Sequence, residues 1–290
     1  MPGCEKKVSR IYLSASADLE ITDMLSMYSG VVPTLLPPFS RLSAPVASHP
    51  DMLMLSVDGH LFSYGEYLEE QPQLRPECAG AEPVGLWEGS ERGSVRSGST
   101  AYEPADSSIL SAAGSGMGGT EDKAPLRYPF DISLNALPLD TERGHFLLCR
   151  SDVLSPEVRR AAESAGREVV NVRQGYTHCS VCTVADGRLI TADRGIAEIA
   201  EGLGASVLLI SPGGIDLEPY NTGFIGGASV RMGSRIIFFG ELKKHPDGDR
   251  ILGFCREAAE DGAPMCGIPL CEIVHAMGRL RDYGSAVVIY

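Results

Sequence analysis

The chain has 290 residues, 43% of them hydrophobic, so it is long enough to bury one large core or two small ones. Its 38 acidic and 25 basic side chains give a net charge of −13 without a basic patch, which argues against nucleic acid and membrane surfaces as partners. No apolar run approaches the roughly 18 residues of a membrane helix, and residues 1–10 lack the apolar region of a signal peptide. We therefore expect a cytoplasmic protein, and its eight scattered cysteines predict no disulfide framework.

The first expected elements are a strand at residues 10–14, a helix at 19–27 and a strand at 31–36. A longer unit then recurs along the chain, which consists of a strand, a tight turn, a second strand, an amphipathic helix and a short third strand. Its turns can supply the positive φ that a two-residue hairpin requires, and they lie at Asp58-Gly59, Arg143-Gly144, Asp186-Gly187 and Gly233-Ser234. The return strands are expected at 61–64, 145–149, 189–191 and 235–239.

Apolar residues at three- and four-residue spacing predict the helices of the later units at 158–165, 196–203 and 251–259. Gly166, Gly204 and Gly262 stand where glycine ends a helix. The third strands are expected at 168–172, 206–211 and 264–270. A final strand at 286–290 has no helix after it, so pairing it with the strand at 10–14 completes a fifth unit.

These elements predict one α/β domain over residues 1–290, a propeller of five ββαβ units whose paired termini leave no open sheet edge. Residues 78–123 interrupt the pattern with Gly, Ser, Glu and Pro and few aliphatic side chains. Such a composition cannot bury enough apolar surface to offset its ordering entropy. We expect a low-complexity, disordered insertion loop there, with a small folded lid as the alternative.

In a closed ring, the segments that lead into the first strand of each unit converge on the axis. They are rich in Asp, Gly, His, Asn and Cys, several of which are poor strand formers. Segments 48–52, 171–182, 220–229 and 240–247 resemble the signature of an uncharacterised bacterial family of the guanidino-group-modifying, or pentein, fold. The resemblance covers nearly the whole chain except the insertion. It implies a five-fold pseudosymmetric pentein with a central pocket, distantly related to arginine deiminase, agmatine deiminase and dimethylarginine dimethylaminohydrolase.

The chemistry of these relatives requires a Cys thiolate, a His that moves protons and carboxylates that hold the guanidinium group. The run from Gly175 to Cys179 resembles the glycine-rich segment that carries the nucleophile of agmatine deiminase. Cys179, His49 and Asp51 are therefore the catalytic candidates. In the relatives, however, the nucleophile lies in the last strand segment, and residues 281–286 contain no Cys here.

Other polar and glycine residues of the lead-in segments are expected to bind the ligand: Asp131, Asn135, Tyr176, Thr177, Asn221, Gly226, Gly227, Asp282 and Ser285. If residues 177–181 are extended, alternation turns Cys179 toward the pocket and His178 away from it. The same alternation separates Cys179 from Cys182, so we expect no metal site, and no cofactor. The alternatives are a buried structural thiol for Cys179 and a hydrogen bond to local backbone for His49. For the acids the alternative is a solvated turn, and for the glycines it is packing against a neighbouring unit.

Two functions follow from this sequence. The first is a small-molecule-binding pentein that acts as a Cys-dependent hydrolase or deiminase on a guanidine, amidine or ureido compound. The second is a non-catalytic pentein that serves as a metabolite-binding or protein-interaction module. The missing Cys in the terminal segment favours the second, and the polar lead-in segments favour a small ligand in both cases.

Overall fold

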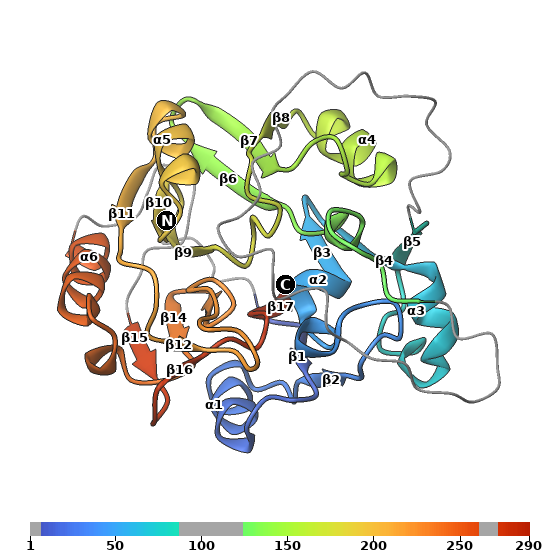
Figure 1. Cartoon of the computed structure of the whole chain (residues 1–290), viewed down its shortest axis with the longest axis horizontal. Coiled ribbons are helices and arrows are strands. Elements are labelled where there is room, and N and C mark those ends of the chain that lie inside the picture. Colours follow the sequence, from blue (N-terminus) through green and yellow to red (C-terminus); the bar gives the residue numbers. More distant parts are fainter. Residues whose placement is uncertain (1–6, 87–123, 261–271) are drawn as a thin grey trace.

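The computed structural model describes residues 7–86, 124–260 and 272–290, and within them the chain forms five three-stranded sheets (Figure 1). In each sheet the first two strands pair antiparallel and the third runs parallel to its neighbour. A helix connects the last two strands of every unit. Such a ββαβ unit cannot cover its own apolar face, so several of them stack to bury a common core.

The first unit joins the two ends of the chain. Its elements, in structural order, are β17 (Ala286–Ile289), β1 (Arg10–Ser14), α1 (Leu19–Ser29) and β2 (Thr34–Leu36). The second unit consists of β3 (Met54–Val57), β4 (His60–Tyr64), α3 (Gly65–Glu70) and β5 (Ala81–Val84). The pairing of β1 with β17 confirms the predicted union of the termini.

The remaining three units follow in chain order. The third comprises β6 (Leu137–Thr141), β7 (Gly144–Cys149), α4 (Pro156–Ser164) and β8 (Glu168–Asn171). The fourth comprises β9 (Val181–Ala185), β10 (Arg188–Thr191), α5 (Arg194–Gly202) and β11 (Ser206–Leu209). The fifth comprises β13 (Ser229–Met232), β14 (Arg235–Phe238), α6 (Gly248–Glu260) and β15 (Glu272–His275). A two-stranded sheet, β12 (Ile215–Asp216) with β16 (Leu280–Arg281), lies outside the repeat.

The first strands of the units form the inner ring, in which β9 contacts β13, β13 contacts β17 and β17 contacts β3. Hydrogen bonds join each unit to the next around the whole ring. They are Arg10 to Ala79 carbonyl, Arg167 to Asp58, Thr141 to Leu203 carbonyl, Arg231 to Val184 carbonyl, and Gly233 amide to Tyr290 hydroxyl. The ring is therefore closed, and the topology confirms the predicted α/β pentein fold.

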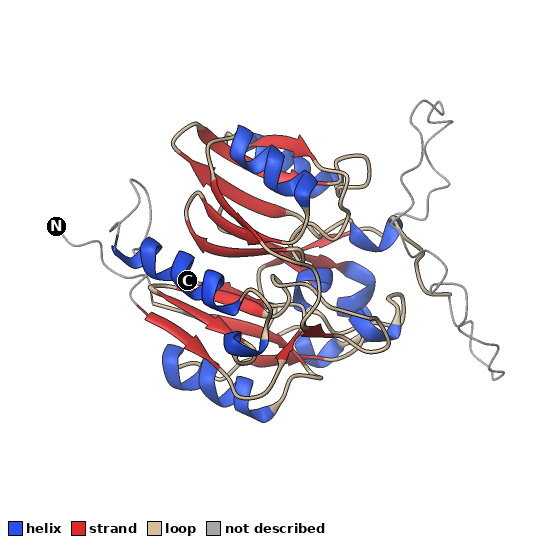
Figure 2. Cartoon of the chain, turned by 60° about the vertical axis from the view of Figure 1, so that its left-hand side comes forward, coloured by secondary structure: helices blue, strands red, loops and turns tan. Residues whose placement is uncertain are grey.

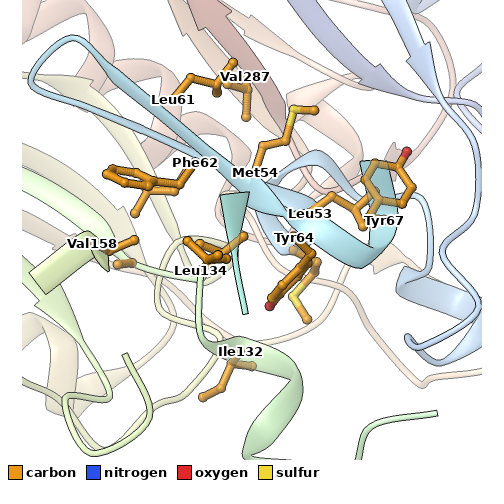
Figure 3. Packing of buried hydrophobic residues seen from close by; sticks show 14 of the residues in the cluster. Leu53, Met54, Leu61, Phe62, Tyr64, Tyr67, Ile132, Leu134, Val158 and Val287 are labelled. Carbon is orange, nitrogen blue, oxygen red and sulfur yellow. The ribbon is translucent and has the colours of Figure 1, made fainter. Parts of the chain in front are cut away.

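The core lies between neighbouring units, and the helices lie along the outside of the sheets (Figure 2). Figure 3 shows this packing, in which Phe62 and Tyr64 of β4 meet Leu134 of the following lead-in segment and Val158 of α4. Val287 of β17 belongs to the same cluster. Because these side chains come from different units, no unit can fold on its own without exposing much of its apolar surface. No helix in the described ranges is apolar and long enough to cross a bilayer.

One expected boundary needs correction. The predicted insertion begins too early, because Cys78 is buried and residues 81–84 pair with β4 as the third strand of the second unit. The rest of the predicted insertion, residues 87–123, lies outside the described residues, and the described chain continues at residue 124. The strand predicted at 264–270 also lies outside the described residues, and the third strand that the structure describes in this unit is β15, which begins at Glu272. The short helix α3 had no periodic signal in the sequence.

Candidate functional site

The lead-in segments of the units meet at the inner ring and bring five polar side chains together. Each of these residues is at most 3% exposed, and we call them the polar cluster: His49, Asp51, Asn135, Cys179 and Asp282. The segments are not extended, as the alternation argument assumed. Pro50–Leu53 forms the short helix α2, Phe130–Ile132 forms a 3-10 turn, and residues 177–180 form a turn before β9.

Asn135 joins three of the lead-in segments. Its Nδ2 donates to Cys179 Sγ at 3.0 Å and to the Asp51 carbonyl at 3.0 Å, while its Oδ1 accepts the His178 amide at 2.8 Å. A side chain that satisfies both ends of its amide in this way is fixed in orientation. Asn135 therefore holds the thiol of Cys179 and the backbone at Asp51 in one place.

Asp282 is fixed by backbone donors and by glycines. Its Oδ2 accepts the Phe224 amide at 2.8 Å, and its Oδ1 accepts the Gly284 amide at 2.9 Å. A Cβ on Gly227 would overlap this carboxylate, and one on Gly284, whose φ is 73°, would overlap His49. These glycines allow the segments of neighbouring units to approach closely, which was one of the two expected uses of the glycine pair.

Asp51 is the least satisfied member of the polar cluster. Its side chain is fully buried, yet neither carboxylate oxygen has a hydrogen-bond partner among the described residues. The imidazole of His178 is close by, with its Nδ1 3.8 Å from Asp51 Oδ2. Burial is the largest influence and raises the pKa of Asp51, but its interactions with His178 and His49 outweigh burial and lower it. An ionised carboxylate without a hydrogen bond is costly in a protein interior, so this carboxylate requires an explanation.

The environment of Cys179 does not produce a reactive thiolate in the free protein. Burial raises the pKa of Cys179 well above its ordinary value, and the carboxylates of Asp51 and Asp282 raise it further. The hydrogen bond from Asn135 opposes this only in part. Low pKa values of reactive cysteines depend on nearby cations or helix N-termini. These neighbours favour the protonated form of the thiol.

Asp131 and Tyr176 form a separate pair. The Tyr176 hydroxyl donates to Asp131 Oδ2 at 2.9 Å, while Asp131 Oδ1 is buried without a partner among the described residues. Burial raises the pKa of Asp131 to about 6. The ring of Tyr176 lies between those of Tyr128 and Phe224, with centroid distances of 5.7 and 6.1 Å.

The other predicted ligand-binding residues have different positions. The hydroxyl of Thr177 donates to the Gln174 carbonyl at 2.7 Å and so stabilises its own turn. The hydroxyl of Ser285 donates to the Ser229 carbonyl at 2.7 Å. Gly226 packs against the backbone carbonyls of 178–181, so it serves the contact between units. Asn221 is exposed and lies outside the polar cluster, which corrects the prediction that it shares a cavity with Cys179.

His178 is the residue that the sequence argument placed incorrectly. In the turn at 177–180 its imidazole lies beside Asp51 rather than on the opposite side from Cys179, and its side chain is 27% exposed. Its ring is thus the part of the site nearest to solvent. Local hydrogen bonds of Thr177 and Ser180 to preceding carbonyls make the turn, and such bonding by Ser and Thr was the available signal. The described residues contain no group of three or more His, Cys, Asp or Glu arranged to hold a metal ion.

The chain resembles several solved structures. A dimethylarginine dimethylaminohydrolase bound to 4-chloro-2-hydroxymethylpyridine is 9% identical over 97% of this chain and 100% of its own, with a TM-score of 0.47. DDAH from Pseudomonas aeruginosa, a mutant complexed with citrulline, is 8% identical over 98% and 100%, with a TM-score of 0.48. SxtG, an amidinotransferase from Microseira wollei in the saxitoxin biosynthetic pathway, is 11% identical over 91% and 75%, with a TM-score of 0.42. No curated protein matches the sequence.

A family model matches residues 106–270, which is more than half of the chain. The matched region contains Asp131, Asn135 and Cys179, whereas His49 and Asp282 lie on either side of it. The model bears the description "Family of unknown function (DUF6873)". The chain is therefore a member of this family of unknown function.

Proposed function

We propose that the chain binds a small guanidine or amidine cation, or a related ureido compound, at the polar cluster and hydrolyses one of its C–N bonds through Cys179. One observation carries the proposal: the buried carboxylate of Asp51 has no hydrogen-bond partner among the described residues and is adjacent to a thiol and two imidazoles. A guanidinium group presents paired N–H donors and a positive charge, which are the two things that this carboxylate lacks. Asp282, 3.8 Å from His49 Nδ1, supplies the second carboxyl group of the site, and burial raises the pKa of this group.

The ligand itself would activate the thiol. In the free protein, Asp51 and Asp282 keep the proton on Cys179 by raising its pKa. A cation bound between these carboxylates offsets their field, so the pKa of Cys179 falls only when the ligand is present. Binding would therefore precede formation of the nucleophile.

The reaction would proceed through a covalent intermediate. Cys179 transfers its proton to His49, and its sulfur forms a bond to the central carbon of the guanidinium or amidinium group. The C–N bond then breaks, and the departing ammonia or amine takes the proton from His49. Water adds to the same carbon and gives a proton to His49. The S–C bond then breaks, His49 returns its proton to the sulfur, and the product gives its remaining proton to the released ammonia or amine. One water is consumed, and the products are ammonia or an amine and a ureido or amide compound.

The alternative is a binding module without catalysis. It is favoured by the 3% exposure of Cys179 and by the hydrogen bond that its sulfur accepts from Asn135, both of which suit a structural thiol. In that case Asp51 would hold the cation, and Cys179 would only pack beside it. The two functions share the ligand and differ in turnover.

Binding of methylguanidine, measured by calorimetry, tests the common part. Asp51→Asn should abolish binding, because it removes the charge while the backbone hydrogen bonds at this residue remain. Asp23→Asn, which makes the same change at an exposed position of α1, is the matched control and should bind as the wild type does. Equal binding by the Asp51 variant would refute the proposed site.

Product release tests the catalytic part. Incubation with methylguanidine should release ammonia or methylamine, and Cys179→Ser should stop the release without preventing binding. Binding without any product from the wild type would reject the hydrolase and leave the binding module. Iodoacetamide should leave Cys179 unmodified at neutral pH in the free protein, as it should Cys149 and Cys182, because burial raises the pKa of the latter two to about 12.

A further inference from the structure

The first unit exposes large apolar side chains, whereas the second, third and fourth units expose none within the described ranges. Of the six such side chains in these ranges, five belong to the first unit: Leu19, Met27, Val32, Leu35 and Tyr290. The sixth is Met277, whose backbone amide donates to Glu20 of α1 at 3.0 Å. Single exposed apolar side chains are ordinary, but their concentration in one unit of a pseudosymmetric ring points to an interaction surface.

The helix of the first unit differs on its outer side from the helices of the later units. In α4, for example, the exposed Arg160 forms an ion pair with Glu157 at 3.1 Å. α1 contains no Lys or Arg, and Leu19, Asp23 and Met27 form an exposed row at four-residue spacing along it. The opposite side of α1 is buried in the core, so this helix has apolar side chains on two sides. Such a pattern is typical of a helix that packs against a second partner.

A cavity of about 270 Å³ lies between the start of α1 and residues 276–283, where β16 runs beside this helix (Figure 1). Its lining is partly apolar and includes the buried side chains of Ile21 and Phe239. Met277 also lines it and is 77% exposed, while Leu19, whose two neighbours in the chain line the cavity, is 79% exposed. Two protruding apolar side chains therefore lie beside a hollow on one face of the molecule.

Charged side chains of both signs surround the same cavity. Asp18 and Glu20 come from the start of α1, and Arg279 and Arg281 lie near Asp216. Arg279 Nε is 3.0 Å from Asp216 Oδ1, and Arg281 Nη1 is 3.6 Å from Asp18 Oδ2. Both arginine side chains are at least half exposed. Exposed ion pairs of this kind contribute little by themselves, so the charges of a partner can join them at small cost.

We infer that the chain forms a two-fold homodimer through this face, with Leu19 and Met277 of each copy packed against the cavity of the other. A two-fold interface brings the same patch of both copies together, so the patch must contain both members of every contact. This face contains both: apolar side chains beside a cavity, and carboxylates beside arginines. A different protein would require only one member of each pair. The inference goes beyond the proposed function and does not depend on it.

Sedimentation velocity of the full chain, from about 1 to about 100 μM, tests the inference, and we expect a dimer in the upper part of this range. Leu19→Glu and Met277→Glu should each raise the dissociation constant of the dimer at least about 10-fold, because each places a further carboxylate among the acids of the interface. Arg281→Glu should weaken the dimer in the same direction, since it removes a cation that faces the acids of the other copy. Ala192→Glu adds a negative charge at an exposed position of the fourth unit, and this matched control should dimerise as the wild type does.

Leu19 and Met277 are both more than three-quarters exposed, so their variants should fold, and an unchanged melting temperature checks this. A wild-type chain that stays monomeric at the highest concentration would overturn the inference. A dimer that both of these Glu variants leave intact would also overturn it, because the interface would then lie elsewhere. So would equal weakening by Ala192→Glu, which would show that added charge rather than its position weakens the dimer.

Discussion

Replacement of Asp131 by Asn should change how the stability of the protein depends on pH. Asp131 is 5% exposed, and only one of its carboxylate oxygens has a described donor, the hydroxyl of Tyr176. Burial therefore raises the pKa of Asp131 from 3.8 to about 6. Between these two values the unfolded chain releases the proton while the folded protein keeps it. Stability then falls as pH rises, and the contribution is fully lost above about pH 6.

The size of the effect follows from this difference. A rise in pKa from 3.8 to about 6 corresponds to about 3 kcal/mol, at about 1.4 kcal/mol per unit. Asn at this position keeps an acceptor for Tyr176 and does not titrate. We expect the free energy of unfolding of Asp131→Asn, relative to wild type, to rise by about 2.5 kcal/mol between about pH 4 and about pH 7.5. Urea denaturation of both proteins at the two pH values measures this change.

The free energies of unfolding of the two proteins are subtracted at each pH, and the two differences are then compared. This comparison cancels the titration of all other carboxylates, which both proteins share. Asp23→Asn, at an exposed position of α1, is the control and should show no comparable change with pH. Tyr176→Phe should move the transition to higher pH, because it removes the donor that lowers the pKa of Asp131. A difference between wild type and Asp131→Asn that is the same at both pH values would refute this account of Asp131.

Other predictions concern the close contacts that hold the ring together. Gly227→Ala should destabilise the protein by at least about 2 kcal/mol in urea denaturation, since the new methyl overlaps the carboxylate of Asp282. Gly253→Ala makes the same change in α6, where nothing lies within 4 Å, and should instead stabilise by about 0.5–1 kcal/mol. If both variants are less stable than the wild type, the expected difference between the crowded position of Gly227 and the open position of Gly253 is wrong. Arg167→Met should lower stability by about 1.5–3 kcal/mol, because this 9% exposed guanidinium binds two carboxylates from neighbouring units; a loss below about 0.5 kcal/mol would show that the bridge is dispensable.

The repeat was visible in the sequence because its elements carry local signals. Gly59, Gly144, Gly187 and Gly233 all have positive φ at the hairpin turns, and the helices α1, α4, α5 and α6 begin and end within a few residues of the predicted bounds. The helix of the second unit had no such signal, since α3 has only six residues and its one buried side chain is Tyr67. Periodicity requires more than two turns to be recognised.

The site was predicted in part, for a different reason. Chain topology brings the lead-in segments together, so membership of His49, Asp51, Asn135, Cys179 and Asp282 in one cluster could be predicted from the unit boundaries. The orientation of these side chains could not be predicted, because the segments are turns and short helices in which the alternation of a strand does not apply. For that reason the position of His178 beside Asp51 was not predicted. The raised pKa of Cys179 was not predicted either, because it depends on the positions of two carboxylates that the sequence shows only as separate residues.

The charge balance of the polar cluster limits the kinds of ligand that the proposed function allows. An anion would face the carboxylates of Asp51 and Asp282 in a buried site and would be repelled by both. A neutral amide could donate to Asp51 but would leave its charge uncompensated. A cation with several N–H donors meets both needs, and it also removes the field that keeps the proton on Cys179. The thiol would then become nucleophilic only beside the molecule that it attacks, and in the absence of that molecule it would be protected from oxidants by its own neighbours.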